Sequence, residues 1–310
     1  MLAYPGALFA QQRMPVVGLL WNDSVKPSPY AAILAAGLRE RGYVVGRNLR
    51  FEDAVALEGY GPMASNAATL VQAKVDLIVT YGATATLAAA KATQDIPIVM
   101  IIGADPVATG VVKSLSHPGG NATGIWTFTS GLNAKRMELL KELKPSVRRA
   151  GLLFAPGSAV QIVVDDAEGA AHRLKIEIVR AEVRAPDKID AAVAKLVQLG
   201  ADAIYVHTSS MLSAHSRSVV ESVAKRRLPA VYGTERYAEA GGLLTYYPSL
   251  SKAFGRAAGQ IDRILKGARP GDLPIDQVSD VELVINLRAA RELGITIPQS
   301  ILQRADRAIE

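Results

Sequence analysis

Residues 75–103 read VDLIVTYGATATLAAAKATQDIPIVMIIG, and this segment carries the pattern that decides the fold. An apolar run ends in a polar turn, an alanine-rich stretch follows, and a second apolar run begins at an Ile-Pro pair. Short apolar runs between turn residues are typical of buried strands, and the stretch between them has the length of a helix. Residues 201–233, ADAIYVHTSSMLSAHSRSVVESVAKRRLPAVYG, repeat this order. The repetition predicts two similar α/β domains in one chain.

The same alternation extends over the rest of the chain. Apolar runs at 16–21, 149–158 and 175–183 predict further strands. Helices are predicted over 29–41, 62–73, 84–93, 132–143, 187–199, 212–226 and 250–265, and in a segment that ends near 173. Strands that alternate with helices in this way favour Rossmann-like, doubly wound parallel sheets. The residues around 125–130 are predicted to cross from the first domain to the second.

Composition excludes several classes of protein. The chain has 310 residues, of which 49% are hydrophobic and 21% charged, as expected of a globular protein with a large core. The absence of cysteine excludes disulfides, thiolate catalysis and zinc–sulfur sites. A formal charge of +6, without a dense basic block, argues against nucleic acid as a partner. No apolar run approaches the roughly 20 residues of a membrane-spanning helix.

The N-terminal residues MLAYPGALFAQQRMP predict a leader outside the fold, at residues 1–13. Their apolar, small-residue character up to Ala10 is typical of the end of a secretory signal peptide, with cleavage before Gln11. The basic region that normally opens such a peptide is missing, so a plain disordered leader is the alternative interpretation. The signal-peptide interpretation predicts a protein exported across the inner membrane.

Ligands of open parallel sheets bind beyond the carboxyl ends of the strands. Aromatic residues make up only 5% of the chain, yet both tryptophans and several tyrosines fall at predicted strand ends. Core packing is the alternative for each single ring, but the set favours an aromatic-walled cleft between the two domains. The candidate ligand-binding residues are Trp21, Asn22, Tyr81, Gly82, Ala83, Thr84, Asp105, Trp126, Ser158, His207, Thr208, Glu235 and Tyr246.

Hydroxyl residues stand at predicted helix starts after several of these strands. Free N–H groups and the helix dipole at Thr84, Ser158 and Ser209 favour a carboxylate or another anion. Simple N-capping is the alternative interpretation for each. No lysine or arginine is found at the predicted strand ends, so we expect the anion to be held by backbone N–H and hydroxyl donors.

Three further polar candidates have structural alternatives. Asp105 precedes a proline and is also suited to an ordinary turn. His207 is either a hydrogen-bond donor to a ligand or a structural histidine. Glu235 is placed to pair with a cation or with Arg236.

Catalytic, cofactor and metal motifs are absent. The chain has no G-x-S-x-G elbow, no H-E-x-x-H, no Walker loop and no G-x-G-x-x-G after the first strand. Its four histidines lack the spacing of metal ligands. The sequence therefore predicts a binding protein with no cofactor, no metal and no catalytic residues.

Longer stretches resemble a known family. They are GLRERGYVVGRNLRFE, IPIVMIIGADPVATGVVKSLSHPGGNATGI, LLKELKPSVRRAGLLF and LVINLRAARELGITIPQSILQRADRAIE. Nearly the whole chain from Val16 is similar to the periplasmic substrate-binding proteins of ABC importers, of the tryptophan/tyrosine type. The resemblance implies a type I periplasmic-binding-protein fold with a hinge, no enzymatic activity, a periplasmic location, a monomer and ABC permease subunits as partners.

The resemblance also implies a division of the chain. One lobe comprises 14–125 and 248–278, and the other comprises 126–247 and 279–310. The helix from Leu250 returns to the first lobe and the VELVINL segment to the second. Amino-acid-binding members carry an acid or amide where this chain has HTSS, and Ser-Asp where it has GTE. An amino acid and an amine-free aromatic or aliphatic carboxylate therefore both stay open as ligands.

Two other classes of protein share such a fold. A two-lobed enzyme, such as a nucleotide-sugar epimerase or a glycosyltransferase, needs cations for a diphosphate, and none is found at the predicted strand ends. The effector domain of a repressor needs an N-terminal helix-turn-helix, and only about 15 residues precede the first strand.

Overall fold

The computed structural model describes residues 13–21, 29–54, 63–127, 131–156 and 160–310. The predicted leader up to residue 12 and the candidates Asn22 and Ser158 lie outside these ranges. The chain forms two compact units, unit 1 with 1–128 and 250–278, and unit 2 with 129–249 and 279–310. The chain thus passes from one unit to the other three times.

Unit 1 contains a six-stranded sheet in which all neighbouring strands are parallel. In spatial order its strands are β11 (Asp276–Val278), β5 (Ala122–Thr127), β4 (Ile98–Ile102), β3 (Leu77–Tyr81), β1 (Val16–Trp21) and β2 (Arg50–Asp53). Three of them, β1, β3 and β4, are almost entirely apolar, as expected of strands covered on both faces. Trp126 pairs with Ile102 in this sheet, so β5 continues past residue 125, where the predicted lobe boundary was placed.

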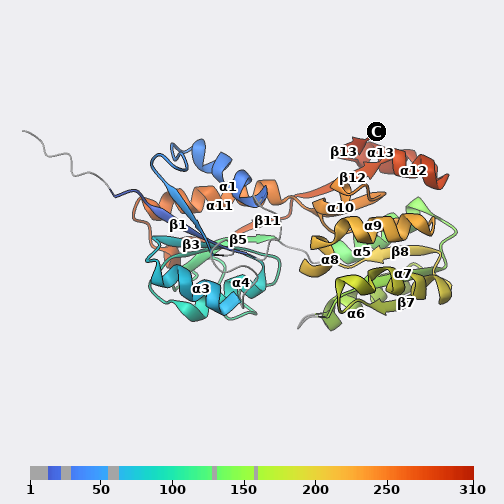
Figure 1. Ribbon diagram of the computed structural model, residues 1–310, viewed down its shortest axis with the longest axis horizontal. Helices are drawn as coiled ribbons and strands as arrows, with labels where there is room; N and C mark the ends of the chain where they lie inside the picture. Colours follow the sequence, from blue (N-terminus) through green and yellow to red (C-terminus); the bar gives the residue numbers. More distant parts are fainter. Residues whose placement is uncertain (1–12, 22–28, 55–62, 128–130, 157–159) are drawn as a thin grey trace, which may run out of the picture. The chain divides into compact units, whose positions relative to one another are not determined.

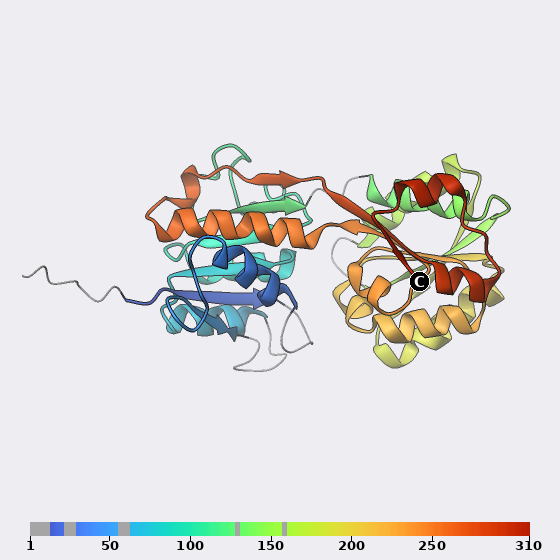
Figure 2. The same ribbon diagram turned by 90° about the horizontal axis from the view of Figure 1, so that it is seen from above.

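Helices cover both faces of this sheet (Figure 1). On one face α1 (Pro29–Arg39) packs on α11 (Leu250–Leu265), and on the other lie α3 (Met63–Gln72) and α4 (Ala83–Ala92). The contact between α1 and α11 is close because Gly37 has no side chain: a Cβ there would lie 2.9 Å from Cβ of Ala258. Figure 2 shows α11 alongside the sheet. The segment from Leu250 therefore belongs to the core of unit 1.

Unit 2 contains a seven-stranded sheet that is parallel except at one pair. In spatial order its strands are β13 (Arg307–Ile309), β12 (Val281–Asn286), β10 (Leu244–Pro248), β9 (Ala230–Tyr232), β8 (Ala203–Val206), β6 (Arg149–Phe154) and β7 (Glu177–Glu182). The antiparallel pair is β10 with β12, which lie side by side in Figure 2. The VELVINL segment thus forms a central strand of unit 2.

Two groups of helices cover the unit 2 sheet. One face carries α5 (Leu132–Leu143), α6 (Val160–Arg173), α12 (Leu287–Leu293) and α13 (Gln299–Arg304). The other carries α7 (Ile189–Gln198), α8 (Ser210–Ala214), α9 (Ser216–Lys225) and α10 (Glu235–Glu239). Short 3₁₀ turns occur at Pro186–Lys188 (η1) and, in unit 1, at Pro270–Asp272 (η2). Both units are thus three-layered α/β structures, which confirms the predicted fold class.

The predicted helices are confirmed in part. Those at 132–143 and 250–265 have the predicted bounds. The helix predicted at 84–93 begins and ends one residue earlier. The helix predicted at 212–226 is interrupted at His215 into α8 and α9, and the one at 187–199 opens with a 3₁₀ turn. Among the described residues, no helix combines the length and apolar content needed to span a membrane.

Candidate functional site

Sheet topology identifies one point on each carboxyl edge where the strand order reverses. In unit 1, β1 lies between β2 and β3, and in unit 2, β6 lies between β7 and β8. The connections leave such a pair of strands toward opposite faces, which opens a crevice at their carboxyl ends. Trp21 and Tyr81 end the first pair and face each other in register, and Phe154 and Val206 end the second. Most of the predicted candidates follow these strands.

The ring of Trp21 fills the core of unit 1. Trp21 is 1% exposed, and its ring meets the ring of Phe254 edge to face at 6.1 Å between centroids. Phe254 belongs to α11 and is itself fully buried. The Trp21 ring has no exposed face for a ligand. In this structure Trp21 therefore packs in the core, which was the alternative interpretation of this residue.

Two other aromatic side chains are only half-buried. Tyr81 packs at 4.9 Å from the ring of Tyr30 and 5.8 Å from that of Phe254. Trp126 packs against the opposite face of the sheet, and its indole N–H donates to the carbonyl of Gly103 at 3.3 Å. Tyr81 and Trp126 are therefore the aromatic candidates in unit 1 that have surface to offer a ligand.

The start of α4 depends on Gly82. This residue has φ 88° and ψ 159°, a conformation that is essentially restricted to glycine. The Thr86 hydroxyl donates to the Gly82 carbonyl at 2.9 Å and lies 2.8 Å from the Thr80 hydroxyl. These two contacts stabilise the turn on its buried side. Because glycine has no side chain, it leaves the N–H groups of the first turn of α4 without a side-chain cap.

Thr84 occupies the second position of α4 rather than the N-cap. It is exposed, and Ala83 begins the helix. The prediction that Thr84 lies at a helix start is confirmed, but the capping alternative is wrong. The ten-residue helix thus presents uncapped N–H groups, the positive end of its dipole and a hydroxyl at the carboxyl edge of unit 1.

Asp105 follows β4 and is exposed. Its Oδ1 accepts hydrogen bonds from the N–H groups of Val107, at 2.8 Å, and Ala108, at 3.1 Å. This is the turn that the Asp-Pro pair suggests. The carboxylate therefore has a structural role and leaves a negative charge at this strand end.

A buried arginine lies at the carboxyl edge of unit 2. Arg136, on α5, is 4% exposed and donates from Nε to the Tyr246 carbonyl at 2.9 Å and from Nη2 to the Gly233 carbonyl at 3.4 Å. Its Nη1 donates to Asn133 Oδ1 at 3.1 Å and to the Tyr205 hydroxyl at 3.4 Å. The strand ends themselves carry no arginine or lysine, as predicted, but a helix brings this arginine to the edge.

The sequence contains a signal that would have located this arginine. Leu132, Arg136, Leu140 and Leu143 recur at helical spacing, and all four are buried. A charged residue on the apolar stripe of a helix is directed into the fold, where it requires partners. The loop-based search for polar residues overlooked it because the guanidinium comes from a helix far along the chain from the strands it contacts.

His207 and Thr208 follow β8 beside this arginine. His207 Nδ1 is buried and has no hydrogen-bond partner among the described residues. Burial, together with the charge of Arg136, lowers the pKa of His207 to about 4, so the imidazole is neutral at pH 7. Gly233 makes room for both neighbours, since a Cβ there would lie 2.1 Å from Thr208 Oγ1 and 3.1 Å from Arg136 Cζ. His207, Thr208, Gly233 and Arg136 therefore form one cluster.

The remaining candidates of unit 2 have different surroundings. Ser209 caps α8, because its hydroxyl accepts from the N–H of Leu212 at 3.1 Å. Tyr246 is half-buried above Arg136, and burial raises the pKa of its phenol. Glu235 begins α10, where burial and the nearby carboxylates of Glu239 and Glu282 raise its pKa. The charge of Arg307 acts in the opposite direction and lowers the pKa of Glu235.

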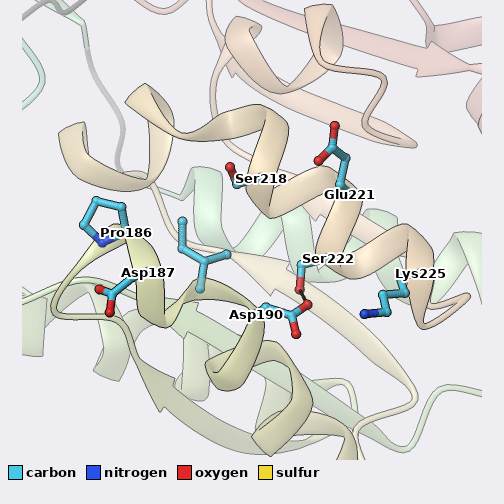
Figure 3. Close-up of a pocket in the computed structure, with 8 residues that line it drawn as sticks. Pro186, Asp187, Asp190, Ser218, Glu221, Ser222 and Lys225 are labelled. Carbon is cyan, nitrogen blue, oxygen red and sulfur yellow. Dashed lines mark hydrogen bonds between the residues drawn. The ribbon is translucent and has the colours of Figure 1, made fainter.

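A hollow of about 320 Å³ lies elsewhere on unit 2, between α7 and α9 (Figure 3). Within its lining, the Ser222 hydroxyl donates to Asp190 at 2.9 Å. Asp190 also pairs with Arg226, which does not line the hollow, at 2.7 Å. It includes no candidate from the strand ends. Across the described ranges, no cluster of His, Cys, Asp and Glu is placed to hold a metal ion.

Comparisons with known proteins agree with this architecture. Residues 29–309 match the family described as ABC transporter substrate binding protein. The "Tyrosine-binding protein" of Clostridioides difficile is 30% identical over 251 residues, which cover 80% of this chain and 72% of that protein.

Two solved structures are similar over nearly their whole length. A conserved domain protein from Vibrio cholerae has a TM-score of 0.84 and 26% identity, and the match covers 96% of this chain and 100% of that one. The "ABC domain in complex with L-Trp" from Streptococcus pneumonia has a TM-score of 0.82 and 28% identity, covering 95% and 99%. Proteins of this family bind solutes and are not enzymes. From the two α/β units and from these matches, this chain belongs to the family of ABC transporter substrate-binding proteins and has the type I periplasmic-binding-protein fold.

Proposed function

We propose that this substrate-binding protein captures a small carboxylate, either an amino acid or an amine-free acid, and delivers it to the permease of an ABC importer. The observation that carries the carboxylate is the start of α4, where Gly82 leaves the first-turn N–H groups uncapped beside the exposed hydroxyl of Thr84. Such a helix end favours an anion through both its N–H donors and its dipole.

Aromatic residues lie at the same carboxyl edge of the unit 1 sheet as that anion site. Tyr81 immediately precedes Gly82, and Trp126 is the last residue but one of β5, which is separated from β3 by β4. Both rings are half-buried and retain surface for an apolar group. The relatives named for tyrosine and solved with L-Trp point to the same combination of a carboxylate and an aromatic group. Aromatic amino acids and their deaminated counterparts are therefore the first solutes to test.

The proposal is tested by isothermal titration calorimetry with L-Trp, L-Tyr and L-Leu, and with the corresponding acids that lack the amine: indole-3-propionate, 3-(4-hydroxyphenyl)propionate and 4-methylpentanoate. The methyl ester of each tight-binding compound is the control. We expect at least one acid to bind and its ester to bind at least about tenfold more weakly, because the charged hydrogen bonds are lost. An ester that binds as tightly as its acid contradicts a carboxylate site.

The valine variant of Thr84 is expected to weaken binding of the carboxylate about tenfold. Valine keeps the shape of the side chain but removes a hydroxyl donor, and a hydrogen bond to a charged group contributes about 1.5–3 kcal/mol. Thr69→Val is the matched control, since Thr69 is a helical threonine of the same unit that lies toward the C-terminal end of α3. Calorimetry of both variants measures the effect. Equal affinities for Thr84→Val and Thr69→Val would argue that the solute does not reach the start of α4.

Bound solute is expected to change tryptophan emission. Both tryptophans of the chain lie in unit 1, and Trp126 is the half-buried one. We therefore expect the change to persist in Trp21→Phe and to disappear in Trp126→Phe, measured by fluorescence titration with the solute that calorimetry identifies. The reverse pattern would assign the solute contact to Trp21.

The permease partner and the periplasmic location belong to the same proposal. ABC substrate-binding proteins act outside the cytoplasm, which supports the interpretation of residues 1–10 as the end of a signal peptide. N-terminal sequencing of the exported protein is expected to start near Gln11. Uptake of the labelled solute by cells with and without this protein tests delivery to the permease.

A further inference from the structure

The amino edge of the unit 2 sheet carries as much excess positive charge as the whole chain. Four neighbouring parallel strands, in the spatial order β9, β8, β6 and β7, begin at this edge. The turns that lead into them, 143–149, 173–177, 198–203 and 225–230, contain eight lysines and arginines but only two acids. This excess of six equals the formal charge of the chain. Since neighbouring strands lie about 4.8 Å apart, the four turns form one cationic strip roughly 15 Å wide.

Most cations of the cationic strip are not neutralised by an ion pair. Arg149 pairs with Glu177 at 2.6 Å, and Arg226 pairs with Asp190 at 2.7 Å. The other six have no carboxylate oxygen within 4.0 Å among the described residues. They are Lys144, Arg148, Arg173, Lys175, Lys225 and Arg227. All of these except Lys144 are exposed, so their charges face solvent.

Acids around the cationic strip lie beside it or are matched by cations. Glu142, one residue before the first turn, pairs with Arg304. The neighbouring turn before β10 and helix α12 together contain two arginines and two glutamates, which leave the excess unchanged. The hollow between α7 and α9 places three acids on one flank, next to Lys225 (Figure 3). Glu310 follows β13, three strands beyond β9.

The helix dipole explains only part of this charge. A cation at the C-terminal end of a helix is stabilised by the dipole, and every turn of the cationic strip follows a helix. The helix-to-strand turns of unit 1, at 39–50, 72–77 and 92–98, are built in the same way but contain five cations and three acids. Their excess is two, against six in unit 2. The charge at the amino edge of unit 2 therefore exceeds what helix ends require.

Exposed aliphatic side chains lie in the same place. Leu199, in the turn before β8, is 41% exposed, and Val197, near the end of α7, is 40% exposed. Arg149 Nη1 donates to the Leu199 carbonyl at 3.0 Å, which brings this leucine into the cationic strip. None of the four turns contains an aromatic residue on which a nucleic-acid base could stack. Cations around aliphatic side chains suit phospholipid headgroups with acyl chains beneath them.

We propose that the cationic strip is an interaction surface for an anionic phospholipid bilayer, to which the protein binds reversibly. This inference goes beyond solute capture. In the sequence the cations are distributed over four segments, and only the parallel order of the strands brings them together. A bilayer at the amino edge leaves the carboxyl edge of unit 2 free, because the two edges are at opposite ends of the strands.

Two cations of the cationic strip occupy positions that favour glycine. Lys175 has φ 58° and Arg227 has φ 54°, in the left-handed region. The double variant Lys175→Gly/Arg227→Gly is therefore expected to remove two charges without a loss of stability, which urea denaturation checks. Lys74→Gly is the matched control. Lys74 has φ 52° and stands in the turn before β3, in unit 1.

Cosedimentation with sucrose-loaded vesicles tests the proposal on the full chain. The vesicles consist of phosphatidylcholine alone or with about a third of phosphatidylglycerol, at an ionic strength of about 0.1 M. We expect the wild type to bind the anionic vesicles at least about tenfold more tightly than the neutral ones. The double variant is expected to lose at least about tenfold, because each cation near an anionic surface contributes about fivefold. Lys74→Gly is expected to bind like the wild type.

Three results of this experiment would overturn the proposal. They are equal binding to both kinds of vesicle, no sedimentation with either, and equal losses in Lys74→Gly and the double variant. The first would remove the role of charge, the second the bilayer, and the third the assignment to the amino edge of unit 2.

The aliphatic part of the surface is tested separately. Leu199→Ser is expected to weaken binding to the anionic vesicles about fivefold, since an apolar side chain no longer enters the bilayer. Val45→Ser is the matched control, because Val45 is 39% exposed in unit 1. Unchanged binding in Leu199→Ser would overturn the choice of a bilayer. So would tighter binding of the wild type to a labelled DNA duplex, measured by fluorescence anisotropy at the same ionic strength.

Discussion

Replacing Trp21 with alanine is expected to lower the free energy of unfolding of unit 1 by about 3–5 kcal/mol. The ring is 1% exposed between β1 and α11 and meets Phe254 edge to face at 6.1 Å. The variant loses the burial of this ring, its aromatic contact and the packing around the cavity that remains. Trp21→Phe keeps an aromatic ring, so its free energy of unfolding is expected to fall less than that of Trp21→Ala.

Urea denaturation with tryptophan emission measures this effect in unit 1 alone, because both tryptophans lie in that unit. In the alanine variant, Trp126 remains as the reporter. Trp126→Phe is the matched control, since it changes a half-buried ring of the same unit, and its loss of stability is expected to be smaller. A Trp21→Ala protein as stable as Trp126→Phe, but impaired in solute binding, would show that Trp21 lines the site instead of filling the core.

The second large effect is a loss of stability on acidification that depends on His207. Burial and Arg136 lower its pKa to about 4, whereas an unfolded chain protonates histidine near pH 6.5. Below pH 6.5 the unfolded state therefore binds the extra proton, and stability falls as the pH falls from about 6.5 toward 4. This difference in pKa between the folded and unfolded states corresponds to a loss of at most about 3 kcal/mol in the free energy of unfolding.

Glu235 acts in the opposite direction. Its raised pKa means that the folded protein binds a proton more readily than the unfolded chain, so acidification adds stability through this residue. The comparison of wild type with His207→Gln cancels this contribution, because Glu235 is present in both. Urea denaturation followed by circular dichroism at pH 7 and pH 4.5 is the measurement. Parallel losses of stability in the two proteins would show that His207 is not held in its neutral form.

The alternation of strands and helices could be predicted because it depends on local patterns. The helix at 250–265 has a strongly amphipathic sequence, and its bounds were predicted correctly. The break at His215 and the short final strand β13 were not predicted. Both involve segments of a few residues, for which the contacts with the rest of unit 2 outweigh local preference.

The candidate functional residues show the same contrast between local patterns and contacts with distant segments. Gly82 and Thr84 were predicted at a helix start, because a strand followed by a polar turn and a helix is visible in the sequence. Trp21 was assigned to a site because it ends a strand beside polar residues, and the sequence does not show that α11 returns to cover it.

Local sequence patterns were sufficient to predict the α/β class, the two repeated halves, most of the elements and the sheet edges at which a ligand is expected. These features follow from hydrophobic periodicity and turn residues, which act over a few positions. The positions of Trp21 in the core and of Arg136 against the carbonyls of Gly233 and Tyr246 emerge only in the folded chain. Both depend on contacts between segments about 100 or more residues apart, and the free energy that places a buried ring or a buried cation comes from neighbours that adjoin it only after the chain has folded.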